Sequence, residues 1–316
     1  MQPAISIQNM GFHYAENSGV VFKSFNLKVE QGERFGLFGP NGAGKTTLMN
    51  LMTGVLEHKE GSIQLLGNEI NIDKTDVNKL FGFVPQHHSF YQELSPVENL
   101  AFFGAWSGLN RKEIKQRTDE LLEVMGLTNV RDKPVAKFSG GMKNRVNLAI
   151  GVIHKPKILF LDEPTTGVDP VSRKEFWEML KRLKQQGITI VVATPYMDEA
   201  TLCDRVALMQ NGKILKIDTP QNICNSFPED LYEVKTENIP ALIKILKEYE
   251  TTKNTYAFGE FVHVVIKKEK DFVYIFLNPK VVSIAEVQLK NSAKNNIFQT
   301  ISELDIHLRP INNSQE

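Results

Sequence analysis

Hydrophobic and polar positions in the first two thirds of the chain alternate between strand-like and helix-like patterns. Short runs that are apolar at nearly every position occupy residues 34–38, 158–161 and 188–193. Such runs are typical of parallel strands that are buried on both faces. Because a helical pattern over residues 173–185 separates the last two runs, this pair predicts a βαβ unit in an α/β fold. Further strands are expected over residues 4–10, 25–29, 62–66 and 81–84, and a further helix over residues 46–53.

A longer helical pattern covers residues 95–125. It opens with Ser95, Pro96 and, three positions after the serine, Glu98. Serine at the N-cap, proline at the first helical position and glutamate at the third form a helix start signal. We therefore expect a helix to begin at this point.

The pattern changes after residue 220, where Asn225 and Pro228 indicate a linker. We expect one domain over residues 1–224 and an accessory α+β domain over residues 225–316. In the second part, strands are predicted over residues 231–236, 255–258, 261–267 and 282–289, and helices over residues 239–249 and 271–277. This βαββαβ order is that of a split βαβ, or ferredoxin-like, domain.

Charge and cysteine content narrow the class of protein. Lys plus Arg and Asp plus Glu number 37 each, so the chain lacks the basic excess of a nucleic-acid-binding protein, and no nucleic-acid partner is expected. Two cysteines, Cys203 and Cys224, without a signal-peptide pattern favour reduced thiols over a disulfide framework. Since the longest apolar runs have the length of strands, a role at a membrane would require a partner.

A glycine-rich sequence separates the predicted strand over residues 34–38 from the predicted helix over residues 46–53. It fits the pattern GxxxxGK[ST] of a P-loop, in which glycines let backbone N–H groups turn toward phosphates at a helix N-terminus. We expect Lys45 to reach the β- and γ-phosphates of ATP and Thr46 to hold Mg²⁺. The expected ATP-binding residues are Gly39, Pro40, Asn41, Gly42, Ala43, Gly44, Lys45, Thr46 and Thr47.

Two adjacent carboxylates, Asp162 and Glu163, follow the apolar run over residues 158–161. Phosphoryl transfer needs such a pair, because Asp162 can bind Mg²⁺ through water while Glu163 polarises the attacking water. A strand that merely ends in acidic residues is the simpler interpretation. The P-loop earlier in the chain favours the catalytic one.

Ser139, Gly140 and Gly141 precede a helical pattern over residues 143–153. A serine hydroxyl and glycine N–H groups at a helix start suit an anion, although a plain helix cap would look the same. These residues stand shortly before the acidic pair, and their order resembles the signature motif of ABC-type ATPases.

The resemblance to ABC transporter ATPases covers about residues 4–217. It implies a P-loop NTPase domain with a helical subdomain over about residues 90–150. It also implies that Tyr14 stacks on adenine, and that Gln86 senses the γ-phosphate, contacts Mg²⁺ and faces a membrane partner. Asp169 resembles a residue of the loop that crosses the interface of a dimer.

In this family the working unit is a head-to-tail dimer, with each ATP between the P-loop of one chain and the signature motif of the other. By this resemblance Ser139, Gly140, Gly141 and Asp169 act in trans, whereas Lys45, Gln86 and Glu163 are catalytic in cis. The second chain could be another copy or a paralogous ABC subunit. The other expected partner is an integral membrane permease, which would place the chain in the cytoplasm at the inner face of the cell membrane.

The sequence departs from the family at several positions. Pro195 stands where a histidine usually contacts the γ-phosphate, and proline has neither a side-chain donor nor an N–H group. We therefore expect slow but real hydrolysis. His87 and His88 are interpreted as surface or partner-facing residues. Phe138 and Asn144 replace a usual leucine and a common glutamine, which are mild changes.

The favoured function is an ATP-hydrolysing subunit that powers a membrane exporter, because residues 98–103 and 196–200 resemble those of exporter-type (ABC-2) ATPases. A non-transport ABC ATPase acting on ribosomes or DNA is disfavoured, since the chain has one cassette and only a short insert. A regulatory module that binds ATP but barely hydrolyses it stays open because of Pro195. The sequence identifies neither the substrate nor the permease.

Overall fold

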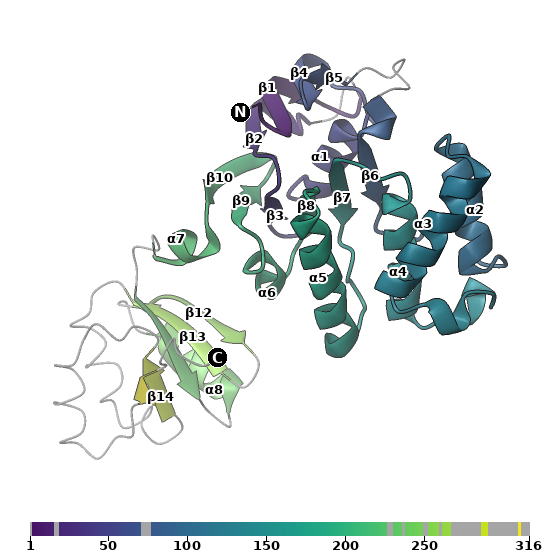
Figure 1. Cartoon of the computed structure of the whole chain (residues 1–316). Coiled ribbons are helices and arrows are strands. Elements are labelled where there is room, and N and C mark those ends of the chain that lie inside the picture. Colours follow the sequence, from purple (N-terminus) through teal and green to yellow (C-terminus); the bar gives the residue numbers. More distant parts are fainter. Residues whose placement is uncertain are drawn as a thin grey trace. The chain divides into compact units, whose positions relative to one another are not determined.

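The chain forms two units, Met1–Cys224 and Asn225–Glu316, each with its own sheet structure (Figure 1). The computed structural model describes residues 2–15, 19–70, 77–225, 230–235, 238–248, 252–258, 261–266, 286–289 and 309–310. The helix expected over residues 271–277 lies outside these ranges.

A six-stranded sheet in the order β10-β9-β3-β8-β7-β6 forms the centre of the first unit. Its strands are β3 (Arg34–Phe38), β6 (Phe81–Val84), β7 (Ile158–Asp162), β8 (Thr189–Thr194), β9 (Arg205–Gln210) and β10 (Lys213–Asp218). All neighbours are parallel except β9 and β10. The loops that follow β3, β6, β7 and β8 therefore leave the sheet at the same edge, which brings distant parts of the sequence together.

Strand β7 shows why the predicted parallel strands are apolar throughout. Ile158 and Phe160 pack into one hydrophobic cluster, and Leu159 and Leu161 pack into a second cluster on the other face. Successive side chains of a strand point to opposite faces. Because both faces of this sheet are covered, every position of the strand is buried.

An antiparallel sheet in the order β2-β1-β4-β5 packs into the same cluster as helix α1. It comprises β1 (Ile5–Phe12), β2 (Phe22–Val29), β4 (Glu60–Leu65) and β5 (Asn68–Glu69), and α1 spans Lys45–Met52. Strand β2 begins before the predicted start at residue 25, because Phe22 pairs with Phe12 and both are buried. Buried residues of α1, including Leu48 and Met52, anchor the helix in this cluster.

The other helices of the first unit pack on the opposite face of the central sheet from α1, where Figure 1 shows α2, α3 and α4 together. They are α2 (Pro96–Trp106), α3 (Arg111–Val124), α4 (Gly140–Val152) and α5 (Pro170–Gln185), followed by the shorter α6 (Met197–Ala200) and α7 (Pro220–Asn225). Turns of 3₁₀ helix cover Val77–Lys79, Thr128–Val130 and Val135–Lys137. None of the helices in the described ranges has the length and apolarity required to cross a bilayer.

The predicted helical stretch over residues 95–125 consists of two helices. Its expected start is confirmed: the Ser95 hydroxyl accepts from the N–H of Glu98, whose carboxylate accepts from the N–H of Ser95. The break comes at Gly108, with φ of 84°, and Asn110 then caps the N-terminus of α3. A left-handed glycine ends a helix at little cost, so the break follows from local sequence.

The described strands of the second unit form a sheet in the order β12-β13-β11-β14-β15. Its elements are β11 (Asp230–Lys235), α8 (Ile239–Lys247), β12 (Thr252–Phe258), β13 (Phe261–Ile266), β14 (Glu286–Leu289) and β15 (Arg309–Pro310). Strand β13 lies between β11 and β12 and is antiparallel to both. Strands β11 and β12 are therefore parallel to each other, and with α8 between them in sequence they form a βαβ unit. In the sheet, β13 lies between its two strands.

Candidate active site

The P-loop connects β3 to α1 and depends on glycine at three positions. Gly42 and Gly44 have φ values of 81° and 100°, in the left-handed region that favours glycine. A Cβ atom on Gly39 would lie 2.2 Å from the backbone oxygen of Met209. No side chain caps the start of α1 at Gly44, so the first N–H groups of the helix can bind an anion.

Lys45 lies at the centre of the loop, with 4% of its surface exposed. Its Nζ atom donates to the backbone oxygens of Gly39 at 2.9 Å and Pro40 at 3.1 Å, and lies 3.8 Å from Oε1 of Glu163. Burial lowers the pKa of Lys45, while the negative charges of Glu163 and Asp162 oppose this shift. The lysine is thus placed between the loop and the acidic pair.

Asp162 ends strand β7 and has 2% of its surface exposed. Its carboxylate bonds the side chain of Thr46, and burial raises its pKa. Its Oδ1 atom is buried and has no hydrogen-bond partner in the described part of the chain. One carboxylate and one hydroxyl suit Mg²⁺, which takes few protein ligands and completes its shell with phosphate and water oxygens. The residues present therefore fit this ion.

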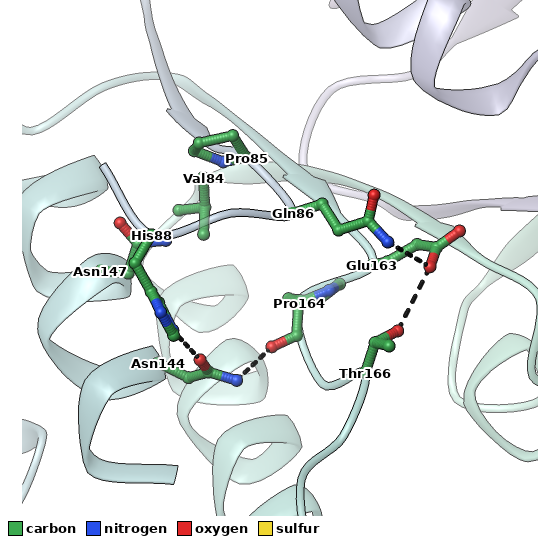
Figure 2. A pocket seen from close by; sticks show the side chains of 9 residues that line it. All are labelled: Val84, Pro85, Gln86, His88, Asn144, Asn147, Glu163, Pro164 and Thr166. Carbon is green, nitrogen blue, oxygen red and sulfur yellow. Dashed lines mark hydrogen bonds between the residues drawn. The ribbon is translucent and has the colours of Figure 1, made fainter. Parts of the chain in front are cut away.

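Glu163 has a strained backbone and a side chain held by three groups. Its φ is 46°, unusual for a residue other than glycine, and its N–H donates to the oxygen of Ala193 at 2.9 Å. Oε2 accepts from Nε2 of Gln86 at 3.0 Å and from Oγ1 of Thr166 at 3.3 Å (Figure 2). With Lys45 near Oε1, the carboxylate is fixed in orientation. No sequence motif pointed to Thr166.

In Figure 2, a second set of contacts, through Asn144, lies beside the contacts of Glu163 with Gln86 and Thr166. Nε2 of His88 lies 2.6 Å from Oδ1 of Asn144, and Nδ2 of Asn144 donates to the backbone oxygen of Pro164 at 2.6 Å. His88 is exposed, as expected, but it also contacts its own chain. A pocket of about 50 Å³ is lined by Val84, Pro85, Gln86, His88, Asn144, Asn147, Glu163, Pro164 and Thr166.

Tyr14 is 61% exposed and lies beside the P-loop. Its hydroxyl is 2.7 Å from Oγ1 of Thr47, and its ring meets that of Phe12 edge-on at 5.0 Å between centroids. These contacts hold an aromatic ring next to the start of α1 while leaving much of its surface open. Stacking on adenine stays a prediction.

Ser139 and Asp169 each cap a helix. Ser139 accepts from a backbone N–H of α4 at 3.3 Å, and Asp169 accepts from the N–H of Ser172 in α5 at 2.9 Å. Hydrogen bonds from Ser172 lower the pKa of Asp169. A Cβ atom on Gly141 would lie 2.7 Å from Oγ of Ser172, so α4 and α5 approach closely there. Within the described ranges, no hydrogen bond or ion pair joins residues 139–141 or Asp169 to the P-loop.

Pro195 follows β8 at the sheet edge that carries the P-loop and the acidic pair. The turn around it is held by Glu199, which is 1% exposed. Glu199 accepts from Oγ1 of Thr194 at 2.5 Å and from Oγ1 of Thr165, and Nε of Arg173 lies 3.7 Å away. No sequence motif indicates this role of Glu199, because two of its partners, Thr165 and Arg173, are distant in sequence.

Comparisons with known proteins show which family the chain is similar to. A family model described as "ABC transporter" matches residues 22–166. The chain is 38% identical over 227 residues to the linearmycin resistance ATP-binding protein LnrL of Bacillus subtilis, a match that covers 72% of each chain. It is 37% identical over 246 residues to the Nod factor export ATP-binding protein I of Ralstonia nicotianae, covering 77% of this chain and 76% of that one.

The chain is also similar to a longer protein and to a solved structure. Identity to the probable multidrug ABC transporter ATP-binding protein YbhF of Escherichia coli is 37% over 198 residues, which is 63% of this chain and 34% of that protein. The solved structure of cbiO1 from Clostridium perfringens, part of the cbiONQ ABC transporter complex, aligns with a TM-score of 0.67 at 27% identity. This alignment covers 72% of the present chain and 92% of cbiO1.

Proposed function

The chain belongs to the ABC transporter family as an ATP-binding subunit, and from this premise we propose that it hydrolyses ATP to power a membrane exporter. The observation that carries the proposal is the convergence of Lys45, Gln86, Asp162 and Glu163. These side chains come from the P-loop and from the loops after β6 and β7, and they meet at one edge of the central sheet.

ATP binding uses the P-loop backbone and Lys45. The triphosphate lies against the N–H groups at the start of α1, and Lys45 transfers its hydrogen bonds from the oxygens of Gly39 and Pro40 to the phosphates. Thr46, Asp162 and Gln86 would hold Mg²⁺, which would supply positive charge beside the phosphates.

Hydrolysis follows from the position of the Glu163 carboxylate. Glu163 accepts a proton from water as the water oxygen bonds the γ-phosphorus. The bond between this phosphorus and the oxygen bridging to the β-phosphate breaks, giving ADP and phosphate. Lys45 stabilises the charge on the leaving oxygen. Pro195 offers no donor at this edge, so the reaction lacks a contact that could contribute about 10²–10³ in rate.

A second chain completes the site in this proposal. Ser139, Gly140 and Asp169 are exposed and have no bond to the P-loop of their own chain in the described residues. Ser139 and Gly140 stand at the N-terminus of a helix whose first N–H groups can bind a γ-phosphate. We assign these residues and Gly141 to the ATP held by the partner, in a head-to-tail dimer with another copy or a paralogue.

An exposed aromatic cluster supports docking to a membrane permease. Tyr91 meets Phe102 at 5.0 Å and Phe103 at 6.2 Å between ring centroids, and Trp106 nearby on α2 is 83% exposed. Exposed aromatic groups of this kind are typical of protein interfaces. The cluster begins five residues after Gln86, so a partner bound there could sense the loop after β6. Such docking would place the chain at the inner face of the cell membrane.

Export is favoured over import by the relatives named for linearmycin resistance and Nod factor export. The function is tested by calorimetry with Mg–ATP and by steady-state phosphate release, comparing the parent with Lys45→Ala. We expect uptake and turnover by the parent alone. Uptake without turnover, with or without a permease, would favour an ATP-binding regulatory module; no uptake would refute the proposal.

A further inference from the structure

The turn that carries Glu163, residues 163–166, is bonded to several other elements of the chain. Three consecutive residues of this carboxylate turn each contact a different element: the loop after β6, helix α4 and helix α6. The contact with α4 is made by Asn144, whose amide donates to the backbone oxygen of Pro164. The other end of the Asn144 side chain meets His88. This chain of contacts has no part in the proposed chemistry so far.

The direction of these hydrogen bonds follows from the backbone oxygen of Pro164. A carbonyl oxygen can only accept, so the amide nitrogen of Asn144 faces Pro164 and its Oδ1 atom faces His88. Since Oδ1 also only accepts, Nε2 of His88 carries the hydrogen and donates. The two bonds, both 2.6 Å, therefore form a directed connection from the imidazole through the amide to the backbone of the carboxylate turn.

The imidazole of His88 is itself held in place. Its ring lies over that of Phe90 at 5.0 Å between centroids, tilted by 31°, and Phe90 is buried. Ser89 donates to Oδ1 of Asn147, one turn along α4 from Asn144, at 3.3 Å. Residues 88–90 are thus attached to α4, and His88 moves with the loop that contains Gln86.

We propose that His88 and Asn144 are a positioning pair that keeps the Glu163 backbone in register with the loop after β6 during the catalytic cycle. Gln86 bonds the Glu163 carboxylate directly, and that bond must break when Gln86 turns to the metal and the γ-phosphate. The contact through Asn144 ends on a backbone oxygen and needs no such exchange (Figure 2). This inference rests on the proposed function, and it adds two residues that do not touch ATP.

The position of Asn144 in α4 also links the pair to the signature residues. Asn144 lies in the second turn of α4, close to Ser139 and Gly140 at its N-terminus. In the proposed dimer these residues contact the partner's γ-phosphate. A movement of the loop after β6 therefore reaches both the carboxylate turn and the signature residues through one side chain.

The kinetic experiment compares His88→Ala, Asn144→Ala and the double variant of the full chain in phosphate release. We expect each single change to lower kcat by about fivefold with KM for ATP within about twofold of the parent, and the double change to be no worse than Asn144→Ala. His88→Gln, which retains a donor, should recover most of the rate. His87→Ala is the matched control, since His87 is an adjacent exposed histidine without a hydrogen bond in the described residues.

A parent-like kcat in His88→Ala would overturn the pairing. An equal loss of kcat in His87→Ala would also overturn it. So would a double variant whose fold-loss of kcat is the product of the two single losses. These failures leave the proposed function intact, because it depends on Mg–ATP uptake and turnover by the parent. A parent that takes up no Mg–ATP refutes the proposed function instead.

A second measurement does not need turnover. Amide hydrogen exchange of the nucleotide-free chain should be faster at Thr165 and Thr166 in His88→Ala and Asn144→Ala than in the parent, and unchanged in His87→Ala. Unchanged exchange in both single variants would overturn the connection. Faster exchange with a parent-like kcat in an active protein would also overturn the proposal, because the contact would then be structural only.

Discussion

Nε2 of Gln86 lies 3.0 Å from Oε2 of Glu163, although the two residues are far apart in the sequence. The parallel pairing of β6 with β7 explains this contact, because both side chains leave the sheet at the same edge. The proposed metal sensor and the proposed general base are therefore in direct contact in this structure. A group that draws Gln86 away removes one of the two hydrogen bonds to Oε2 of Glu163, and the bond from Thr166 remains.

Replacement of Glu163 by glutamine should separate binding from hydrolysis. The amide cannot accept the proton of the attacking water, so kcat should fall by about 10²–10⁴-fold while Mg–ATP affinity stays near that of the parent. Phosphate release and calorimetry on the same preparation measure the two quantities. A variant with parent-like turnover would show that Glu163 is not the general base.

Pro195→His should raise turnover. A histidine at this position would stand at the sheet edge beside the acidic pair and could supply the missing donor, worth at most about 10²–10³ in rate. Tyr196→Phe offers a control for general disturbance of the turn, because only the backbone N–H of Tyr196 bonds Thr194. An unchanged rate in Pro195→His would mean that another group already fills this role.

Glu199→Ala should destabilise the first unit. It leaves the hydroxyls of Thr194 and Thr165 and the charge of Arg173 without their shared acceptor, which we expect to cost about 2–4 kcal/mol in the free energy of unfolding. Urea unfolding monitored by circular dichroism measures the change. Asp198→Ala is the matched control, because this exposed neighbour also pairs with Arg173 and should cost less than about 1 kcal/mol.

Asp162→Asn should stabilise the nucleotide-free chain near pH 7, with a gain that disappears in acid. Burial raises the pKa of Asp162 above its ordinary value of 3.8, so the folded state holds this proton more tightly than the unfolded state. Above the folded pKa the buried carboxylate costs stability, and below the unfolded pKa it costs nothing. The advantage of the variant should therefore fade as the pH falls through the folded pKa toward 3.8.

This expectation is checked by thermal unfolding of both chains from neutral pH downward, within the range where both refold. A variant that is less stable than the parent at neutral pH would contradict it. The same substitution should weaken Mg–ATP binding, because it removes a charged oxygen from the proposed metal site.

Much of the site could be read directly from local sequence. Residues 39–47 specify their own loop, because glycines with positive φ and a lysine at the helix start have a local physical meaning. Ser95 likewise marks the start of its helix, because its capping bonds reach only three residues along the chain. In each case the groups that interact are close neighbours in sequence, so spacing and residue type suffice.

Tertiary structure alone decided the rest. The contacts of Glu163 with Gln86, of Asn144 with His88 and Pro164, and of Glu199 with its partners join residues from separate strands and helices. Their side chains meet because parallel strands end at one edge of the sheet, in an order that is set by the packing of the whole unit. No spacing along the chain indicates that order. The reacting groups could therefore be predicted from sequence motifs, whereas the residues that hold them in place are visible only in the tertiary structure.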